Sequence, residues 1–194
     1  GKMHNIEMGG TFDVTTTANG KVSFDGVADN VYLAGGIAAV TSSKPVTLKG
    51  ITNKSAVSFE NNISKSIQPK NAYVGGTVGY LNLAGNVANR SVSVFKSSHN
   101  EGVISYYGKT TDGAYIGGVV GGSANTSLNG CTNAQSGKII SKGIAGGVEK
   151  MYDGGSVIVT HDMAVGGVAG EVGYDVTGCL NDAEIDYTCV ANTA

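Results

Sequence analysis

The sequence lacks tryptophan and has only one arginine (Arg90) and six leucines among its 194 residues. Leucine, arginine and glutamate favour helices, whereas the abundant valine and threonine suit a pleated sheet. This bias excludes a helical bundle and argues against a doubly wound α/β fold. The lone arginine also removes the usual bidentate anchor for phosphate or carboxylate, so the sequence is poorly suited to phosphorylated or polyanionic partners.

Charged residues are scarce as well, at 14% of the chain against about 25% in typical proteins, and the net charge is −2. No stretch forms the basic face that nucleic-acid binding needs, and no apolar run approaches the roughly 18 residues of a membrane span. The three histidines show no metal-ligand spacing, and neither a nucleophile elbow nor a phosphate-binding loop occurs. We therefore expect no nucleic-acid partner, no membrane insertion and no catalytic residue.

Cysteine is too sparse to form a disulfide scaffold, because Cys131, Cys179 and Cys189 are only three and an odd number. This cysteine count does not distinguish an oxidising from a reducing cellular compartment. The first residues, Gly1 to His4, do not form a signal peptide, so any export signal would already have been removed.

Glycine, by contrast, supplies 31 of the 194 residues, and 41% of the chain is hydrophobic. The hydrophobic residues of the chain are numerous enough to fill a core despite the high glycine content, so we expect an ordered all-β protein. Glycine pairs followed by small or apolar residues recur four times, with pair intervals of 40, 42 and 49 residues. The copies begin at Ala34-Gly35-Gly36, Val74-Gly75-Gly76, Ile116-Gly117-Gly118 and Val165-Gly166-Gly167, and a partial copy is Gly143-Ile144-Ala145-Gly146.

A second element follows each full copy and has the form apolar-x-small-(Ile/Cys/Ser)-x-Asn. Its copies span residues 48–53, 95–100, 128–133 and 176–181, and they end at Asn53, Asn100, Asn133 and Asn181. Four ordered copies of two linked elements predict a solenoid, in which each unit buries its apolar face only by stacking on its neighbours. Glycine and asparagine tolerate the corner conformations that such a coil needs.

Cys131 and Cys179 occupy the position that Ile51 holds in the first copy, so we interpret them as small core residues. Rungs of a solenoid lie about 4.8 Å apart. A disulfide between Cys131 and Cys179 is therefore the alternative if their copies occupy adjacent rungs.

We divide the chain into an atypical N-terminal rung or cap (1–30), a repeat solenoid (31–188) and a C-terminal tail (189–194). Residues 60–71 and 81–92 are expected to be polar excursions from the coil, with Pro69 marking a loop. A β-sandwich adhesin domain is the alternative fold, because irregular spacing also fits hairpins.

The glycine-pair element and the Cys-x-Asn element together resemble the GLUG-type repeats of secreted and surface-anchored bacterial proteins. The best copies are Gly118-Val119-Val120-Gly121 with Cys131-Thr132-Asn133, and Gly167-Val168-Ala169-Gly170 with Cys179-Leu180-Asn181. The resemblance covers roughly residues 31–188. It implies a right-handed parallel β-helix displayed outside the cell, as in adhesin-like proteins of gut Bacteroidetes, and it carries no catalytic residues.

Asp182, Glu184 and Asp186 form the sharpest polar motif in the sequence. Alternation along a strand places all three carboxylates on one face, about 7 Å apart at successive pairs. Such a row suits Ca²⁺ ligation or acid–base cleavage of sugars, and it equally suits a solvated outer face with Ala183 and Ile185 pointing inward. Calcium is the one cofactor that the sequence leaves open.

The nine tyrosines are the other candidates, because exposed aromatic rings stack on sugars and anchor protein interfaces. Some precede polar loops or flank glycine-rich turns: Tyr106, Tyr107, Tyr80, Tyr152 and Tyr174. The alternative is that most of them, such as Tyr73 and Tyr115, pack within the ladder.

The sequence favours a secreted or cell-surface bacterial repeat module for adhesion or display, part of a longer surface protein and not an enzyme. Its expected partners are a host glycan, a polysaccharide or an extracellular-matrix protein. The alternatives are a β-helix polysaccharide lyase or glycoside hydrolase, and a pure stalk or spacer.

Overall fold

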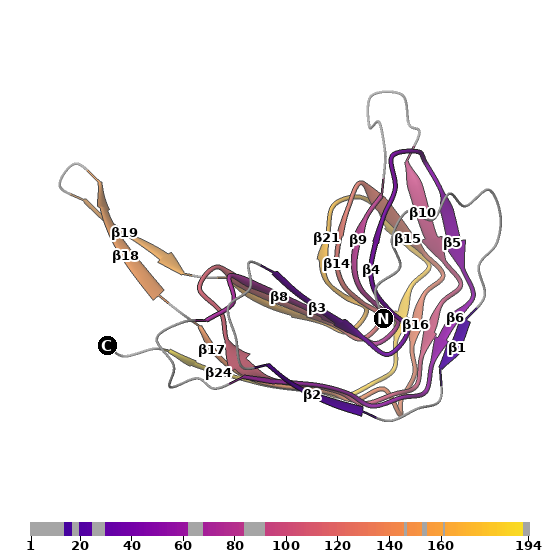
Figure 1. Ribbon diagram of the computed structural model, residues 1–194, viewed down its shortest axis with the longest axis horizontal. Helices are drawn as coiled ribbons and strands as arrows, with labels where there is room; N and C mark the ends of the chain where they lie inside the picture. Colours follow the sequence, from indigo (N-terminus) through magenta and orange to yellow (C-terminus); the bar gives the residue numbers. More distant parts are fainter. Residues whose placement is uncertain are drawn as a thin grey trace.

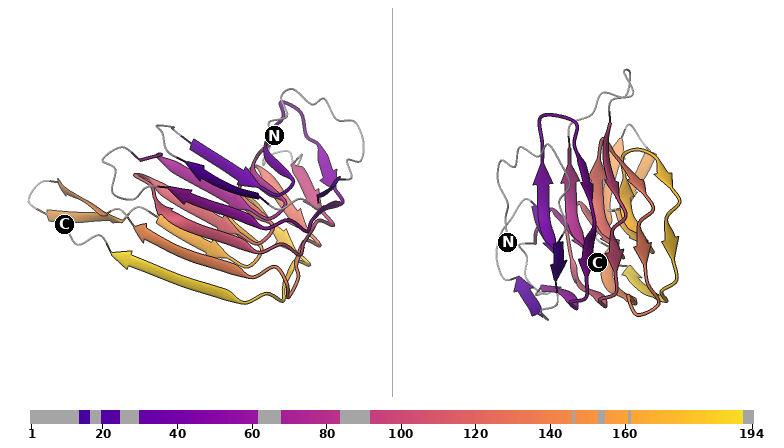
Figure 2. Two further views of the ribbon diagram at one scale, coloured as in Figure 1. Left: turned by 60° about the horizontal axis from the view of Figure 1, so that its bottom comes forward. Right: turned by 90° about the vertical axis from the view of Figure 1, so that its right-hand side faces the viewer.

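The computed structural model describes residues 14–16, 20–24, 30–61, 68–83, 92–145, 147–152, 155–160 and 162–191, and the regular elements in these ranges are all β-strands. The chain winds in four rungs through five parallel sheets, which we number 1 to 5 in the order each rung visits them (Figures 1 and 2). No helix long and apolar enough to cross a membrane occurs in these ranges.

Each sheet takes one strand from every rung. Sheet 1 contains β3 (Asn30–Ala34), β8 (Asn71–Gly75), β13 (Gly113–Gly117) and β20 (Asp162–Gly166). Sheet 2 contains β4 (Ile37–Thr41), β9 (Val78–Asn82), β14 (Val120–Ala124) and β21 (Ala169–Val172). Sheet 3 contains β5 (Thr47–Lys49), β10 (Ser93–Lys96), β15 (Thr126–Asn129) and β22 (Val176–Thr177).

The last two sheets gain a fifth strand from the N-terminal part of the chain. Sheet 4 contains β1 (Val14–Thr16), β6 (Ile51–Asn53), β11 (His99–Asn100), β16 (Thr132–Asn133) and β23 (Leu180–Asn181). Sheet 5 contains β2 (Gly20–Phe24), β7 (Val57–Asn61), β12 (Ile104–Lys109), β17 (Ile139–Ala145) and β24 (Ile185–Ala191).

This architecture confirms the predicted parallel β-solenoid. Strands of successive rungs pair in parallel throughout the five sheets, whereas a β-sandwich would be joined by antiparallel hairpins. The alternative of a β-sandwich adhesin domain is therefore wrong. The one antiparallel pair of the described strands is a hairpin, β18 (Gly147–Tyr152) with β19 (Gly155–Thr160), inserted between β17 and β20. This insertion accounts for the longest interval between glycine pairs.

The solenoid is bent into two lobes, each with its own apolar core (Figure 1). In lobe I, sheets 1 and 5 enclose a core built around Phe59, Tyr106 and Ile116. In lobe II, sheets 2 and 3 enclose a second core around Leu81 and Phe95. Alternation along each strand supplies these residues, since every second side chain points inward. The outer faces of sheets 1 and 2 are thereby left facing each other across a crease between the lobes.

The crease explains the spacing of the glycines. A Cβ atom on Gly121 in sheet 2 would lie 2.6 Å from the backbone nitrogen of Val74 in sheet 1, and one on Gly170 would lie 2.5 Å from that of Ile116. The backbones of the two sheets therefore touch at the base of the crease, where no side chain fits.

The first repeat copy is displaced by one residue from its predicted alignment. Ala34 pairs with Gly75, where the repeat pattern places Gly35, and Ile37 pairs with Val78. The register is set by the inward-pointing residues of the strands, such as Leu33 against Val74, which outweigh the match between glycine pairs.

The Asn element forms a buried ladder at the corner between sheets 4 and 5. Asn53 donates from Nδ2 to Oδ1 of Asn100 at 2.8 Å, Asn100 donates to Asn133 at 2.8 Å, and Asn133 donates to Asn181 at 2.8 Å. Each Nδ2 also donates to a carbonyl that follows it in its own rung, such as Gly102 O for Asn100. The ladder satisfies backbone groups at the corner and locks the four rungs in register.

The predicted domain boundaries differ slightly from the strands. Within residues 1–30, β1 and β2 extend sheets 4 and 5, and the remaining residues of this segment lie outside the described ranges, apart from Asn30, which begins β3. The predicted tail from residue 189 begins inside β24, which continues to Ala191. Residues 62–67 and 84–91 of the two predicted polar excursions also lie outside the described ranges.

Candidate functional site

The acidic motif of the last rung does not form the single strand face that its spacing predicts. Strand β24 begins at Ile185, so Asp182 and Glu184 lie in the corner before it and only Asp186 belongs to a strand. Glu184 forms an exposed ion pair with Lys138, 3.1 Å away. No group of three or more metal-ligating side chains is found in the described part of the chain. Ala183 is buried as predicted, but Ile185 is 40% exposed.

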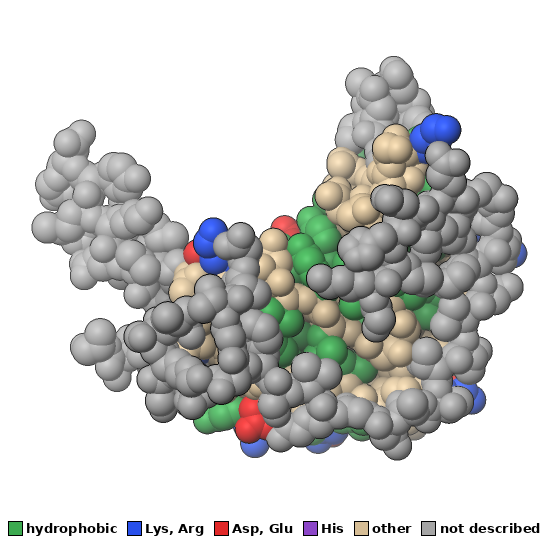
Figure 3. All heavy atoms as spheres, in the orientation of Figure 1, with side chains coloured by type: hydrophobic (Ala, Val, Ile, Leu, Met, Phe, Trp, Pro, Cys, Tyr) green, Lys and Arg blue, Asp and Glu red, His purple; other side chains and the backbone are tan. Residues whose placement is uncertain are grey.

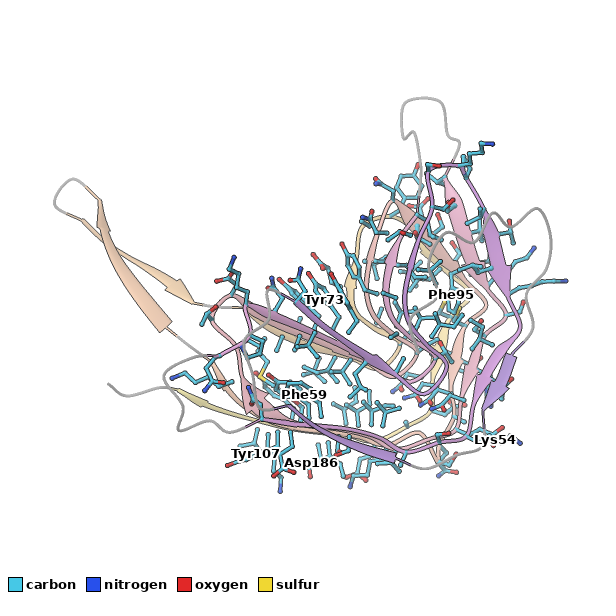
Figure 4. All side chains as sticks on the ribbon, viewed as in Figure 1. Lys54, Phe59, Tyr73, Phe95, Tyr107 and Asp186 are labelled. Atoms are coloured by element: carbon cyan, nitrogen blue, oxygen red, sulfur yellow. The ribbon has the colours of Figure 1, made fainter. Side chains whose placement is uncertain are left out.

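The tyrosine pair of sheet 5 splits between the core and the surface. Tyr106 points into lobe I, where it is 2% exposed and stacks on Phe59 with ring centroids 5.1 Å apart. Tyr107 points to the outside and is 45% exposed (Figure 4). Burial removes Tyr106 from the candidate binding tyrosines and leaves Tyr107 among them, because strand alternation points one member of such a pair into the core. The side chain of Tyr152 lies outside the described part of the chain, and Tyr174 is half-buried.

Four other tyrosines gather in the crease, and we call them the tyrosine row: Tyr32, Tyr73, Tyr115 and Tyr80. The first three share one register position on β3, β8 and β13 of sheet 1, and Tyr80 comes from β9 of sheet 2. Ring centroids are 5.5 Å apart for Tyr32 and Tyr73, and 4.9 Å for Tyr73 and Tyr115. Tyr80 lies 5.5 Å from Tyr32 and 4.5 Å from Tyr73.

The tyrosine row faces the space between the lobes and not a core. All four side chains are partly buried, and Tyr73 projects from sheet 1 into this space (Figure 4). The space-filling view shows the molecule hollowed at the same place (Figure 3). Aromatic rings on an outer sheet face contribute contact area to a partner that a buried ring cannot.

Gly122 makes room for the row. On sheet 2 it occupies the position next to Tyr80, and a Cβ atom there would lie 2.7 Å from Cδ1 of Tyr73 and 3.2 Å from Cδ2 of Tyr80. The rings of these two tyrosines therefore lean over the glycine. The next position along the same sheet is Glu171, an exposed carboxylate beside the row.

Burial and Glu171 raise the pKa of two tyrosines of the row, Tyr73 and Tyr80. Burial, and then the negative charge of Glu171, raise the pKa of Tyr73 far above its ordinary value of 10.0. The same two causes, in the same order, raise the pKa of Tyr80. The protonated phenols can donate as well as accept hydrogen bonds, next to a carboxylate that only accepts.

Cys131 and Cys179 occupy neighbouring rungs, as the repeat predicts. The backbone nitrogen of Cys131 donates to Sγ of Cys179 at 3.4 Å, and both cysteines are free thiols. Cys131 is fully buried in the core of lobe II and Cys179 packs against that core. The interpretation as small core residues is confirmed.

The sequence names Tyr106, Tyr107 and Tyr80 among the candidate exposed tyrosines and gives Tyr73 and Tyr115 as examples of packing within the ladder. The structure buries Tyr106, exposes Tyr107 and places Tyr80 beside Tyr73. Tyr73 and Tyr115 do stack in a ladder, but on an outer face. A signal was available: Tyr32, Tyr73 and Tyr115 recur at intervals of 41 and 42 residues, nearly those of the glycine pairs. Equal spacing places them in one row, although only the bend of the solenoid shows that the row faces outward.

In the comparison with known proteins, no family model, no curated protein and no solved structure matches the chain.

Proposed function

We propose that this chain is a non-catalytic repeat module of a secreted or cell-surface bacterial protein, which adheres to a partner or displays a binding surface. The tyrosine row carries the proposal. Four partly buried aromatic rings gathered on one outer face form a patch of apolar surface, and such patches mark interaction sites. The resemblance to GLUG-type repeats supports the extracellular setting.

The solenoid supports this role mechanically. The buried Asn ladder and the parallel pairing fix the rungs relative to one another, so the residues of the crease are held in place by the fold. A binding face built on such a preorganised scaffold loses little entropy when a partner docks. The expected partners are a host glycan, a polysaccharide or an extracellular-matrix protein.

The test is binding of the purified, labelled chain to an array of mucin glycans, plant and bacterial polysaccharides and matrix proteins. The decisive variant is Tyr73→Ala combined with Tyr80→Ala, which removes the centre of the tyrosine row. Tyr107→Ala is the matched control, because it removes an exposed tyrosine from the outer face of sheet 5. Selective binding that the double variant loses and the control keeps is the expected result. Silence of the folded wild-type chain across the array would overturn the proposal and favour a spacer.

A further inference from the structure

The last rung leaves both apolar cores open to solvent. Its five strands, β20 to β24, are the outermost strands of the five sheets, and each pairs with the preceding rung on one side and with none of the described strands on the other (Figure 2). Val176 is in register with the buried Leu128 of lobe II, yet it is 52% exposed. Ile185 is in register with the buried Ile139 of lobe I and is 40% exposed. We call the open side of β22, β23 and β24 the end face.

The opposite end of lobe II is closed. The strands of the first rung there, β4 and β5, are also the outermost strands of their sheets. Their core residues Ile37, Val40 and Leu48 are nevertheless only 3%, 5% and 1% exposed. The exposure of Val176 is therefore not a general property of an outermost rung. A second copy of the chain, stacked head to tail, would not offer a matching open core at its first rung.

The Asn ladder is incomplete at the end face. Each of the first three asparagines uses Nδ2 twice, once for a carbonyl of its own rung and once for Oδ1 of the next asparagine: Asn53, Asn100 and Asn133. Asn181 donates to the carbonyl of Ala183 at 2.9 Å and accepts from Asn133. Its second N–H has no acceptor in the described part of the chain, where the other three asparagines have the next rung.

The backbone of the end face is unpaired in the same direction. The amide nitrogens of Leu180 and Asp182 each donate to a carbonyl of the preceding rung at 2.9 Å. Successive amides along a strand point to opposite sides, so the amide of Asn181, which lies between them, points away from that rung. An open strand edge of this kind is a template on which another strand can pair.

We propose that the end face binds a further coil of the same repeat, supplied by a separate polypeptide. The contacts between the existing rungs define the chemistry of this partner, because the end face continues the surface on which each rung receives the next. The partner must run parallel to β22, β23 and β24, accept from Asn181 with an asparagine Oδ1, and cover Val176 and Ile185 with apolar side chains. The second repeat element, followed by a strand of alternating apolar residues, meets these requirements. This strand-addition surface is separate from the tyrosine row and goes beyond the proposed adhesive function.

The test uses the full chain and a labelled peptide with the sequence of residues 93–109, which spans β10 to β12. In the fold, Asn100 of this segment accepts from the asparagine of the rung before it, and Phe95 and Ile104 are in register with core residues of that rung. Fluorescence anisotropy measures the Kd, and hydrogen exchange read by mass spectrometry reports where the peptide lies. We expect saturable binding that slows amide exchange in β22 to β24 and leaves the exchange of β3 to β5 unchanged. A peptide of scrambled sequence should not bind.

A change in the peptide tests the ladder without altering the chain. Asn100→Leu in the peptide keeps the size of the side chain and removes the acceptor for Asn181, so it should weaken binding about tenfold. Because the chain itself is unchanged, this comparison does not depend on the folding of any variant.

Changes in the chain test the open cores. Val176→Lys and Ile185→Lys each place a charge where the peptide would bury an apolar side chain, and each should weaken binding roughly tenfold or more. Leu180→Lys is the matched control, because Leu180 is also 52% exposed but is in register with Thr132 on the outer face of sheet 4. It should leave the Kd unchanged. Circular dichroism checks that each variant is folded.

Failure of the peptide to bind the folded chain, or equal effects of Val176→Lys and Leu180→Lys, would overturn the proposal. Slowed exchange in β3 to β5 would place the peptide at the first rung and would overturn it as well. Self-association of the chain alone that Val176→Lys abolishes, measured by sedimentation, would show that a second copy occupies the end face instead. Binding to the glycan and protein array depends on the tyrosine row and not on the end face, so the two proposals can fail independently.

Discussion

Asn100 donates a hydrogen bond of 2.8 Å from Nδ2 to Oδ1 of Asn133, a residue 33 positions further along the chain. The same amide group donates to the carbonyl of Gly102 and accepts from Asn53, so one buried side chain serves three rungs. The ladder is thus a polar core in its own right, parallel to the two apolar cores.

Asn100→Ala should therefore destabilise the chain strongly. It removes the Asn100 donor to Oδ1 of Asn133 and one of the acceptors of Asn53 Nδ2, both at fully buried positions. We expect a loss of about 3 kcal/mol in the free energy of unfolding. Urea unfolding measures it. Asn129→Ala is the control, because Asn129 is exposed at the end of β15 and should be within about 0.5 kcal/mol of wild type. Similar losses in the two variants would contradict the role of the ladder.

Substitution of Gly121 tests whether the backbones of sheets 1 and 2 are in contact at the base of the crease. A Cβ atom there would lie 2.5 Å from the carbonyl oxygen of Gly79 and 2.6 Å from the nitrogen of Val74, both backbone atoms that cannot rotate away. Gly121→Ala should cost about 3 kcal/mol or more, because the two lobes must move apart. Loss of packing in the crease should also appear as changed NMR shifts for Tyr73.

Gly130→Asn is the matched control for Gly121→Ala. Gly130 has φ of 59°, a Cβ atom there would have no heavy atom within 4 Å, and asparagine tolerates this backbone region. The variant should unfold within about 1 kcal/mol of wild type. If Gly121→Ala were equally mild, the backbones of sheets 1 and 2 would not be in contact.

The sequence predicts the fold well because the asparagines of the repeat have one structural role, which is to form hydrogen bonds at a buried corner. The asparagines recur wherever a corner needs a buried amide, and all four fall in register as expected. Glycine is less informative about register. The repeat pattern aligns Gly36 with Gly76, the second glycine of the next pair, whereas the strand pairing aligns it with Thr77. The glycine pattern therefore misaligns the first copy by one residue.

The candidate site was harder to predict because it depends on the bend between the lobes. Alternation shows that Tyr73 and Val74 point to opposite faces of sheet 1, but not which face is covered. The same limit applies to Asp182 and Glu184, which fall in a corner and not on the strand that alternation requires. Contacts between sheets, unlike periodicity within a strand, leave little trace in one sequence.

Cys131 should be the less reactive thiol of the pair in neighbouring rungs. Burial raises its pKa to about 12, so very little thiolate is present near pH 8, and its side chain is fully buried. Cys179 is only partly buried. We expect iodoacetamide to label Cys179 first in the native chain, with both cysteines labelled in urea, as measured by peptide mass spectrometry. Equal native rates at the two sites would show that the core of lobe II is open to solvent.

The buried tyrosines predict how stability changes at high pH. Burial raises the pKa of Tyr106 well above 10.0, while nearby Thr110 lowers it slightly without forming a full hydrogen bond to the phenol. The folded chain therefore keeps a proton that the unfolded chain releases near pH 10. The phenol of Tyr106 therefore makes its full contribution to the free energy of unfolding below pH 10. This contribution is lost as the pH rises through the raised pKa of the folded state.

Tyr106→Phe isolates this contribution, because phenylalanine keeps the stacking on Phe59 and removes the ionisable hydroxyl. Between pH 10 and 11.5, the free energy of unfolding should fall less steeply in the variant than in wild type, by up to about 1.4 kcal/mol per pH unit. At pH 7 the variant should be as stable as wild type or slightly more stable, since the Tyr106 hydroxyl is buried without a hydrogen bond. Tyr107→Phe is the control variant, because it removes a phenol that is 45% exposed from the same strand. Urea midpoints at four pH values between 8 and 11.5 measure both slopes, and parallel curves for wild type and Tyr106→Phe would show that the phenol of Tyr106 ionises as readily in the folded chain as in water.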